Sequence, residues 1–292
     1  MTEFNPSRRA TLALLAATAA LPAARAAQRP PLPVNTPGLD HLDVVVPDVE
    51  KTTRFYMGLL RTTLHAQPFQ GAQRYFVLLG PLPQDRAVGY IAVGASRGRG
   101  TYIGHFCTGV VGWQRENPPE FAAMKERFRA AGYGEFPGNR GFGGLFNDPD
   151  GLEIQFLPSP DKLVVEAVPS DLVPPLQGLV TPRGIDNMVA KVSNLDRAVA
   201  WYRILYGREK KREKNRATFA FRNGSRLILE GSEYTYGNAQ PRYVRFGLRT
   251  EAFDRARVEA GIVALGGKVV GTDGKALRLR DVDGIELELV PG

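Results

Sequence analysis

Two of the three histidines in this chain stand in the middle of strand-like runs, where an imidazole can act as a metal ligand or as an acid–base group. His41 lies within residues 38–46, GLDHLDVVV. His105 lies within residues 101–110, TYIGHFCTGV, whose β-branched and aromatic residues predict a strand. A lone strand histidine is more often a hydrogen-bonded core or surface residue than a ligand, and His65, after the first predicted helix, is expected at the surface.

The alternation of the first run predicts which side chains lie beside His41. Successive side chains of a strand point to opposite sides, so Leu39, His41, Asp43 and Val45 are expected to share one face. The intervening apolar residues are suited to packing beneath a helix. The face with His41 can therefore line a concave cavity.

A third run adds oxygen donors. Residues 147–156, NDPDGLEIQF, predict a turn followed by an alternating strand with Glu153 and Gln155 on one face. The same Asp-x-Asp-Gly turn and alternating strand return at residues 280–289, RDVDGIELEL. The repeat suggests the last hairpin of two related sheets.

Internal repetition extends to the strands and helices that must position these residues. The strand at 38–46 and the helix at 51–60 correspond to a strand at 184–192 and a helix at 195–205, with polar N-cap candidates before each helix. Each helix carries an aromatic residue followed by tyrosine. Two further strand–helix units, with strands at 102–110 and 243–248 and helices at 117–131 and 250–265, complete four units, two on either side of a proline-rich segment.

The N-terminus has the pattern of an export signal. Arg8 and Arg9 precede an alanine-rich apolar run and an A-x-A site, and the run is too short to span a membrane. Residues 1–26 are therefore predicted to be a twin-arginine-type signal peptide, which implies a periplasmic location, and residues 27–37 a proline-rich linker.

Composition narrows the choice of partners. The charged residues, with a net charge of +8, are scattered or interleaved with glutamates, which argues against a nucleic-acid surface. Cys107 is the single cysteine, so an intramolecular disulfide and a cysteine-rich zinc site are excluded. We expect a small-molecule substrate, no nucleic acid and no stable membrane insertion after signal removal, and the sequence leaves a homodimer open.

The opening GLDHLDVVVPDVEKTTRFY, the strand IGHFCTGV and the ending DPDGLEIQF resemble the vicinal-oxygen-chelate superfamily of glyoxalases, bleomycin- and fosfomycin-resistance proteins and extradiol dioxygenases. The resemblance implies an α+β fold of two tandem glyoxalase-like domains, at 38–158 and 183–292, joined by a linker at 159–182. Each domain would contain two βαβββ modules that form a cup-shaped mixed sheet around a central metal site.

The resemblance also implies a ligand set. Carried over position by position, the metal ligands are His41, His105 and Gln155 of the first domain. Two histidines and a carboxylate are typical of non-haem iron dioxygenases, but here the third position holds a neutral amide. A glyoxalase-type fourth ligand has no carboxylate candidate in the strand at 88–94. The cofactor is expected to be a divalent metal ion, with Fe(II) favoured over Mn, Ni or Zn.

The equivalent positions of the second domain carry Asn187, Arg245 and Glu288. An arginine has no acceptor atom and cannot bind a metal. Arg245 is expected to pair with Glu288 or with Glu230 in a structural or substrate-shaping role, and the alternative is that it binds an anionic small molecule.

Three functions follow from these observations. The leading hypothesis is an exported metal-dependent enzyme acting on a small bidentate oxygen-bearing substrate, with dioxygenase chemistry first and lyase or isomerase chemistry second. Asp43 and Glu153, on the cavity face, are the candidate catalytic residues. The other two hypotheses are a metal-free small-molecule binding protein and an exported scaffold or partner subunit.

Overall fold

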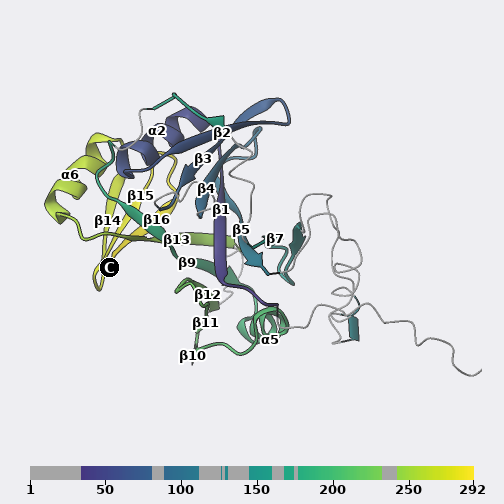
Figure 1. Cartoon of the computed structure of the whole chain (residues 1–292). Coiled ribbons are helices and arrows are strands. Elements are labelled where there is room, and N and C mark those ends of the chain that lie inside the picture. The colour runs from purple at the N-terminus through teal and green to yellow at the C-terminus, as the bar shows by residue number, and fades with distance from the viewer. Residues whose placement is uncertain are drawn as a thin grey trace, which may run out of the picture. The chain divides into compact units, whose positions relative to one another are not determined.

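The computed structural model describes residues 34–80, 89–111, 126, 129–130, 145–159, 168–173, 177–231 and 242–292. These residues form two eight-stranded mixed sheets with few helices, which confirms the expected α+β fold (Figure 1). The predicted signal peptide and most of the 27–37 linker lie outside the described residues, as does most of the helix predicted at 117–131. Among the described helices, none combines the length and apolar character needed to cross a bilayer.

The first sheet is built around two antiparallel central strands, β1 and β5, and each also pairs in parallel with a strand of its own module, β4 and β7. The strand order is β6-β7-β5-β1-β4-β3-β2-β8. Its elements are β1 (Gly38–Val46), α2 (Val49–Leu59), β2 (Leu64–Phe69), β3 (Ala72–Leu78), β4 (Tyr90–Ala95), β5 (Tyr102–Val110), β6 (Leu145–Asn147), β7 (Glu153–Pro158) and β8 (Val168–Pro169). Strand β8 comes from the segment expected to be a linker and pairs with β2.

The second sheet repeats this plan, with antiparallel β9 and β13 at its centre and β12 and β16 as their parallel neighbours. Its order is β10-β11-β12-β9-β13-β16-β15-β14. Its elements are β9 (Pro182–Val192), α5 (Leu195–Tyr206), β10 (Lys211–Glu213), β11 (Arg216–Ala220), β12 (Arg226–Gly231), β13 (Arg242–Thr250), α6 (Arg255–Ala264), β14 (Lys268–Asp273), β15 (Ala276–Arg280) and β16 (Glu286–Pro291).

The helices begin where polar side chains can accept their free backbone N–H groups. Asp48 Oδ1 accepts from the backbone of Lys51 at 3.0 Å, and Asn194 Oδ1 accepts from Arg197 at 2.9 Å. Caps of this kind are typically worth about 1 kcal/mol each. The residues expected to start these two helices therefore do so.

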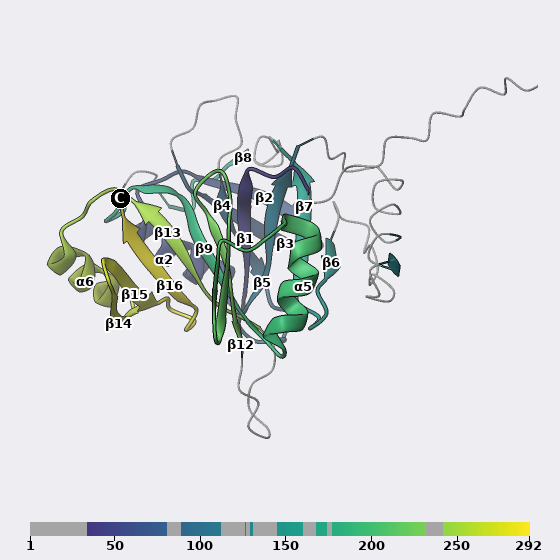
Figure 2. The ribbon, with the colours of Figure 1, turned by 90° about the horizontal axis from the view of Figure 1, so that it is seen from below.

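The repeated aromatic–tyrosine pairs and Asp-x-Asp-Gly turns join the two sheets reciprocally. Tyr56 of α2 donates to the Asp281 carboxylate of the second sheet's turn at 2.9 Å. Tyr202 of α5 donates to the Asp148 carboxylate of the first sheet's turn at 3.1 Å, and α5 lies beside β6 and β7 (Figure 2). One buried apolar cluster contains residues of both sheets, so the two domains share a core.

Candidate metal centre

His41 and His105 meet across the two central strands of the first sheet. Their Nε2 atoms are 3.3 Å apart although the residues are 64 positions apart in the sequence. Both residues are buried. The antiparallel pairing of β1 with β5 brings the two rings together, because it places His41 opposite Cys107, two residues beyond His105.

Gln155 supplies a third atom at the same point. Its Oε1 lies 3.2 Å from His105 Nε2, because parallel pairing of β5 with β7 sets Gln155 beside Cys107. Two ligand atoms each about 2.1 Å from one ion lie about 3.0–3.4 Å apart in octahedral or tetrahedral geometry. The spacing of the three atoms fits a shared cation.

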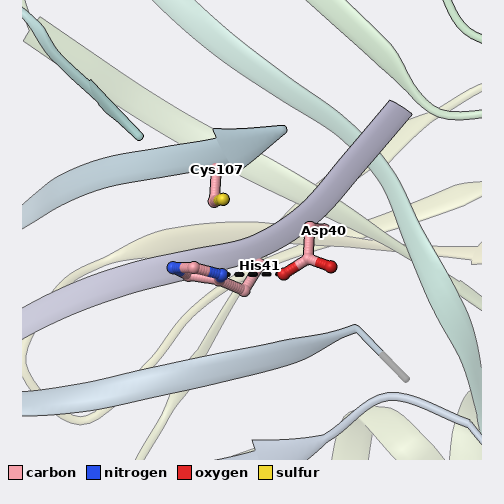
Figure 3. Close-up of side chains that lie close together, drawn as sticks. All are labelled: Asp40, His41 and Cys107. Atoms are coloured by element: carbon pink, nitrogen blue, oxygen red, sulfur yellow. Dashed lines mark hydrogen bonds and ion pairs between the residues drawn. The ribbon is translucent and has the colours of Figure 1, made fainter. Parts of the chain in front are cut away.

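A β-bulge orients the first imidazole. The register of β1 shifts between Leu39 and His41, so Asp40 is an extra residue, and its Oδ1 accepts a hydrogen bond from His41 Nδ1 at 2.9 Å (Figure 3). This bond places the ring proton on Nδ1 and leaves the Nε2 lone pair for coordination. The bulge also sends Leu39 into the main apolar core, so the expectation that Leu39 shares the face of His41 is wrong.

A second carboxylate stands behind His105. Asp43 Oδ2 lies 3.6 Å from His105 Nδ1, and Asp43 Oδ1 is held by an ion pair with Arg74. Gly104 makes this approach possible, because a side chain at that position would collide with the Asp43 carboxylate. With both Nδ1 atoms facing carboxylates, two imidazole lone pairs and an amide oxygen converge on one point. A divalent cation coordinated by these three atoms would satisfy them, and so would a proton on one of the two Nε2 atoms.

Burial keeps His105 neutral. Desolvation is the largest cause and, together with the adjacent His41, outweighs the raising effect of Asp43, so the pKa of His105 is lowered to about 4. A neutral imidazole is the form that coordinates metals. His105 is therefore available as a ligand at neutral pH without losing a proton first.

Aromatic residues wall one side of the site. Tyr90 of β4 stacks on the His41 ring, with centroids 4.4 Å apart and planes 9° apart, and Phe76 meets Tyr90 edge-on. Phe76 and Tyr90 belong with Leu78 and Ala92 to a buried apolar cluster separate from the main core. The sequence analysis did not identify Tyr90, although its strand is the parallel neighbour of the one that carries His41.

Cys107 offers another ligand group. Its Sγ, a carboxylate oxygen of Asp40 and a ring nitrogen of His41 lie within 4.8 Å of one another (Figure 3). However, Asp40 already accepts the Nδ1 proton of His41, and the thiol is completely buried and directed to the carbonyl of Thr108 at 3.6 Å. The set of His41, His105 and Gln155 therefore has the better donor geometry.

The remaining candidates lie apart from this point. Glu153 is half-buried beside His105 in the parallel ladder, and its backbone carbonyl accepts from Tyr243 at 2.8 Å. His65 is half-buried in β2, opposite Phe76, and therefore not the surface residue expected. The strand register places it three strands from His41.

The second sheet holds an ion-pair network at the equivalent place. The registers of β9, β13 and β16 put Asn187, Arg245 and Glu288 where the first sheet has His41, His105 and Gln155. Arg245 pairs with both expected acids, Glu288 at 2.9 Å through Nε and Glu230 at 3.0 Å. The guanidinium of Arg245 thus lies in the second sheet at the place that corresponds to the candidate metal centre of the first.

The bulge is duplicated together with its carboxylate. The register of β9 against β13 shifts between Ile185 and Asn187, and Asp186 accepts from Asn187 Nδ2 at 2.8 Å. Asp186 is in turn paired with Arg226. The β-bulge is the same in both sheets, whereas the two histidines suited to metal coordination are found in the first.

Residues 38–156 match the model of the Glyoxalase/Bleomycin resistance protein/Dioxygenase superfamily. The first domain belongs to this superfamily. The matched span contains all three residues of the candidate metal centre. A comparison with curated proteins finds no match to this glyoxalase-like chain.

Solved structures share the fold of both glyoxalase-like domains. The chain is similar to BphC, a halotolerant catechol dioxygenase, with 16% identity over 88% of this chain and 87% of that one, and a TM-score of 0.61. The 2,3-dioxygenase LapB from Pseudomonas sp. KL28 gives 13% identity over 89% and 93% of the two chains, with a TM-score of 0.61. The Mn(II)-bound glyoxalase from Novosphingobium aromaticivorans gives 14% identity over 88% and 82%, with a TM-score of 0.55.

Proposed function

We propose that this protein is a divalent-metal-dependent dioxygenase in which His41, His105 and Gln155 hold the ion. One observation carries the proposal: the Nε2 atoms of the buried His41 and His105 lie 3.3 Å apart, and Oε1 of the half-buried Gln155 lies 3.2 Å from His105 Nε2. The similarity of the fold to catechol and 2,3-dioxygenases supports the reaction class. A bound Fe(II) would supply Lewis acidity and sites at which a bidentate oxygen-bearing substrate and dioxygen can be brought together.

The donor set suits an exchangeable divalent ion. A ligand set of two imidazoles and an amide oxygen is neutral, so it binds a dication less tightly than a set with a carboxylate. Three ligands from neighbouring strands also leave positions for substrate. Fe(II) is the favoured ion, and Mn(II) is the next choice because a similar glyoxalase is described as Mn(II)-bound.

The surrounding residues have separate roles in this proposal. Asp40 and Asp43 orient the two imidazoles, and Arg74 holds Asp43 in place. Because Asp43 is engaged in this way, Glu153 is the better candidate to accept a substrate proton. Within the described part of the chain, the Glu153 carboxylate makes no hydrogen bond or ion pair. Tyr90 and Phe76 would exclude water beside His41.

Metal content and oxygen consumption test the proposal together. Protein purified without chelators is expected to carry a divalent ion, and His41→Ala and His105→Ala are expected to lose it, while the control His65→Ala retains it. Fe(II)-loaded protein should consume oxygen with at least one member of a catechol panel. A wild-type protein that is purified without metal and cannot be loaded with Fe(II), Mn(II), Ni(II) or Zn(II) would contradict the proposal.

A glyoxalase-like lyase or isomerase is the second candidate, supported by the similarity of the fold to an Mn(II)-bound glyoxalase. It predicts turnover of 2-oxo aldehyde–thiol adducts without oxygen uptake. A metal-free binding protein would instead retain ligand affinity after chelation and in both His→Ala variants.

Export to the periplasm is part of the proposal. It rests on the paired arginines and the apolar run within residues 1–26. Replacing Arg8 and Arg9 by lysine in a fusion with a reporter is expected to retain the protein in the cytoplasm. Unchanged export would contradict the twin-arginine assignment.

A further inference from the structure

A cleft of about 740 Å³ is lined mainly by the second sheet and reaches Gly104 and Glu153 of the first, which are the chain neighbour and the ladder partner of His105. Its lining comes from β9, β12, β13, β15 and β16 and from the beginnings of β5 and β7. None of His41, His105 and Gln155 lines it. Its volume lies within the range typical of small-molecule sites, about 300–1,000 Å³.

The lining of the cleft is rich in cations. It contains Arg99, Lys191, Arg242, Arg245, Arg278 and Arg280. Three of these are paired internally, Arg245 with Glu230 and with Glu288, which is outside the lining, and Arg278 and Arg280 with Glu286. The other two acids of the lining are Glu153, whose carboxylate has no ion-pair partner among the described residues, and Asp283, which is directed away, since it accepts from Thr52 and lies 3.8 Å from the ammonium of Lys51.

Lys191 and Arg242 stand directly opposite each other in the antiparallel ladder of β9 and β13. Like charges at such positions repel each other, so an anion bound beside them would relieve the repulsion. Within the described ranges, neither residue has a carboxylate within ion-pair distance. Arg99 is in the same situation, since its described contacts are the carbonyl of Ser96 and the ring of Tyr102.

Ion pairs within the protein fix the position of Arg245 in the cleft. Arg245 is held at two nitrogens by acids on both sides, and a guanidinium fixed in this way can present its remaining N–H groups without further ordering cost. Carboxylates and phosphates are the ligands that match guanidinium geometry. A concave cleft of this size is suited to a small molecule and not to an extended polyanion.

We propose that this cleft binds a small oxyanion, a carboxylate or a phosphate, through Lys191, Arg242 and Arg99, with Arg245 as the fixed floor of the site. The residues proposed to bind the anion are distinct from His41, His105 and Gln155, and occupancy of the cleft does not require a bound metal. It gives the second domain a binding role in place of the metal site that its sequence lacks.

Calorimetry and thermal unfolding of the full chain test this site with inorganic phosphate and with succinate, each against sodium chloride at equal ionic strength. At least one of the two anions is expected to bind saturably and to raise the melting temperature. Binding of phosphate alone would identify a phosphate site, and binding of succinate alone a carboxylate site. The absence of both effects would overturn the proposal.

A matched pair of variants assigns the binding to the cleft. Lys191→Gln with Arg242→Gln should weaken the anion roughly tenfold or more, since two charge-assisted contacts are lost. Lys214→Gln with Arg208→Gln removes the same charge from exposed positions outside the cleft and should leave affinity unchanged. Equal weakening in the two double variants would overturn the cleft assignment. Metal content of the cleft variant, and anion binding by His41→Ala, are both expected to match wild type, which separates this site from the metal proposal.

Discussion

Asp40 Oδ1 accepts the Nδ1 proton of His41 at 2.9 Å, and the extra residue of a β-bulge makes this contact between sequence neighbours possible. In a regular strand the two side chains would point to opposite faces. The bulge therefore places the candidate ligand His41 next to Asp40, the carboxylate that fixes its tautomer.

Asp40→Asn is expected to weaken metal binding by roughly 10–100-fold, the usual cost of losing a carboxylate behind a metal-bound histidine. Asp186→Asn is the matched control, because Asp186 occupies the same bulge in the second sheet and supports Asn187 there. Competition with a fluorescent chelator measures the affinity. Equal losses in the two variants would mean that the effect is structural and not local to the site.

Gln155→Glu is expected to tighten metal binding on the order of tenfold or more, because a negative charge is added next to the cation in a buried site. Gln155→Leu should weaken it, since an oxygen donor is removed. The same competition assay compares the two variants with wild type. Unchanged affinity in both would place Gln155 outside the coordination sphere.

The stability of the metal-free protein should depend on His105 at mildly acidic pH. Its pKa is lowered to about 4 in the folded state, from an ordinary value near 6.5, so the unfolded chain binds the extra proton between these values. This contribution is fully present above about pH 6.5 and is lost as the pH falls through 4, amounting to about 3 kcal/mol. Urea unfolding of wild type and His105→Gln at several pH values checks it, and an identical pH profile would contradict it.

Asp148 has the opposite dependence. Burial raises its pKa to about 6, so the folded state holds the proton more tightly, and stability falls as the pH rises from about 4 to 6. In wild type, this fall in stability with rising pH offsets part of the rise in stability that His105 produces over the same pH range. Asp148→Asn is therefore expected to make unfolding more steeply pH-dependent in this range. A flatter profile in this variant would refute the assignment.

The reciprocal tyrosines should stabilise the two domains jointly. Tyr56→Phe and Tyr202→Phe each remove a buried hydrogen bond to an aspartate, at an expected cost of about 1.5–3 kcal/mol. A single cooperative unfolding transition should be retained in both variants, since the apolar core spans the two sheets. Separate transitions in wild type would show that the domains unfold independently.

Repetition made the fold predictable. Three of the predicted strand–helix units, the N-caps at Asp48 and Asn194 and the bounds of β1 and β5 follow from strand periodicity and turn chemistry, which are local properties. The helix predicted at 117–131 lies mostly outside the described residues. The pairing of Tyr56 with Asp281 did not follow, although both motifs were visible. It depends on how one sheet packs on the other, and local patterns carry no information about that.

The three candidate ligands were named from the sequence, and the residues that support them were not. His41, His105 and Gln155 follow from a resemblance at matching positions, and the structure brings the three together. Leu39 was assigned to the face of His41 by strict alternation, and a bulge at Asp40 reverses that assignment. A bulge is a property of the pairing between strands, so one strand's sequence does not reveal it.

The duplicated bulge also means that the backbone at the ligand position has the same shape in both domains, although the two histidines are found in the first. The second domain retains Asp186 at the β-bulge and has Asn187 in place of the first imidazole. It also has a carboxylate, Glu288, where the first domain has the amide of Gln155. Two substitutions, Asn187→His and Arg245→His, would recreate a two-histidine, one-carboxylate centre on a backbone already shaped for it. With these two changes the second domain would carry a donor set of the same kind as the candidate metal centre of the first.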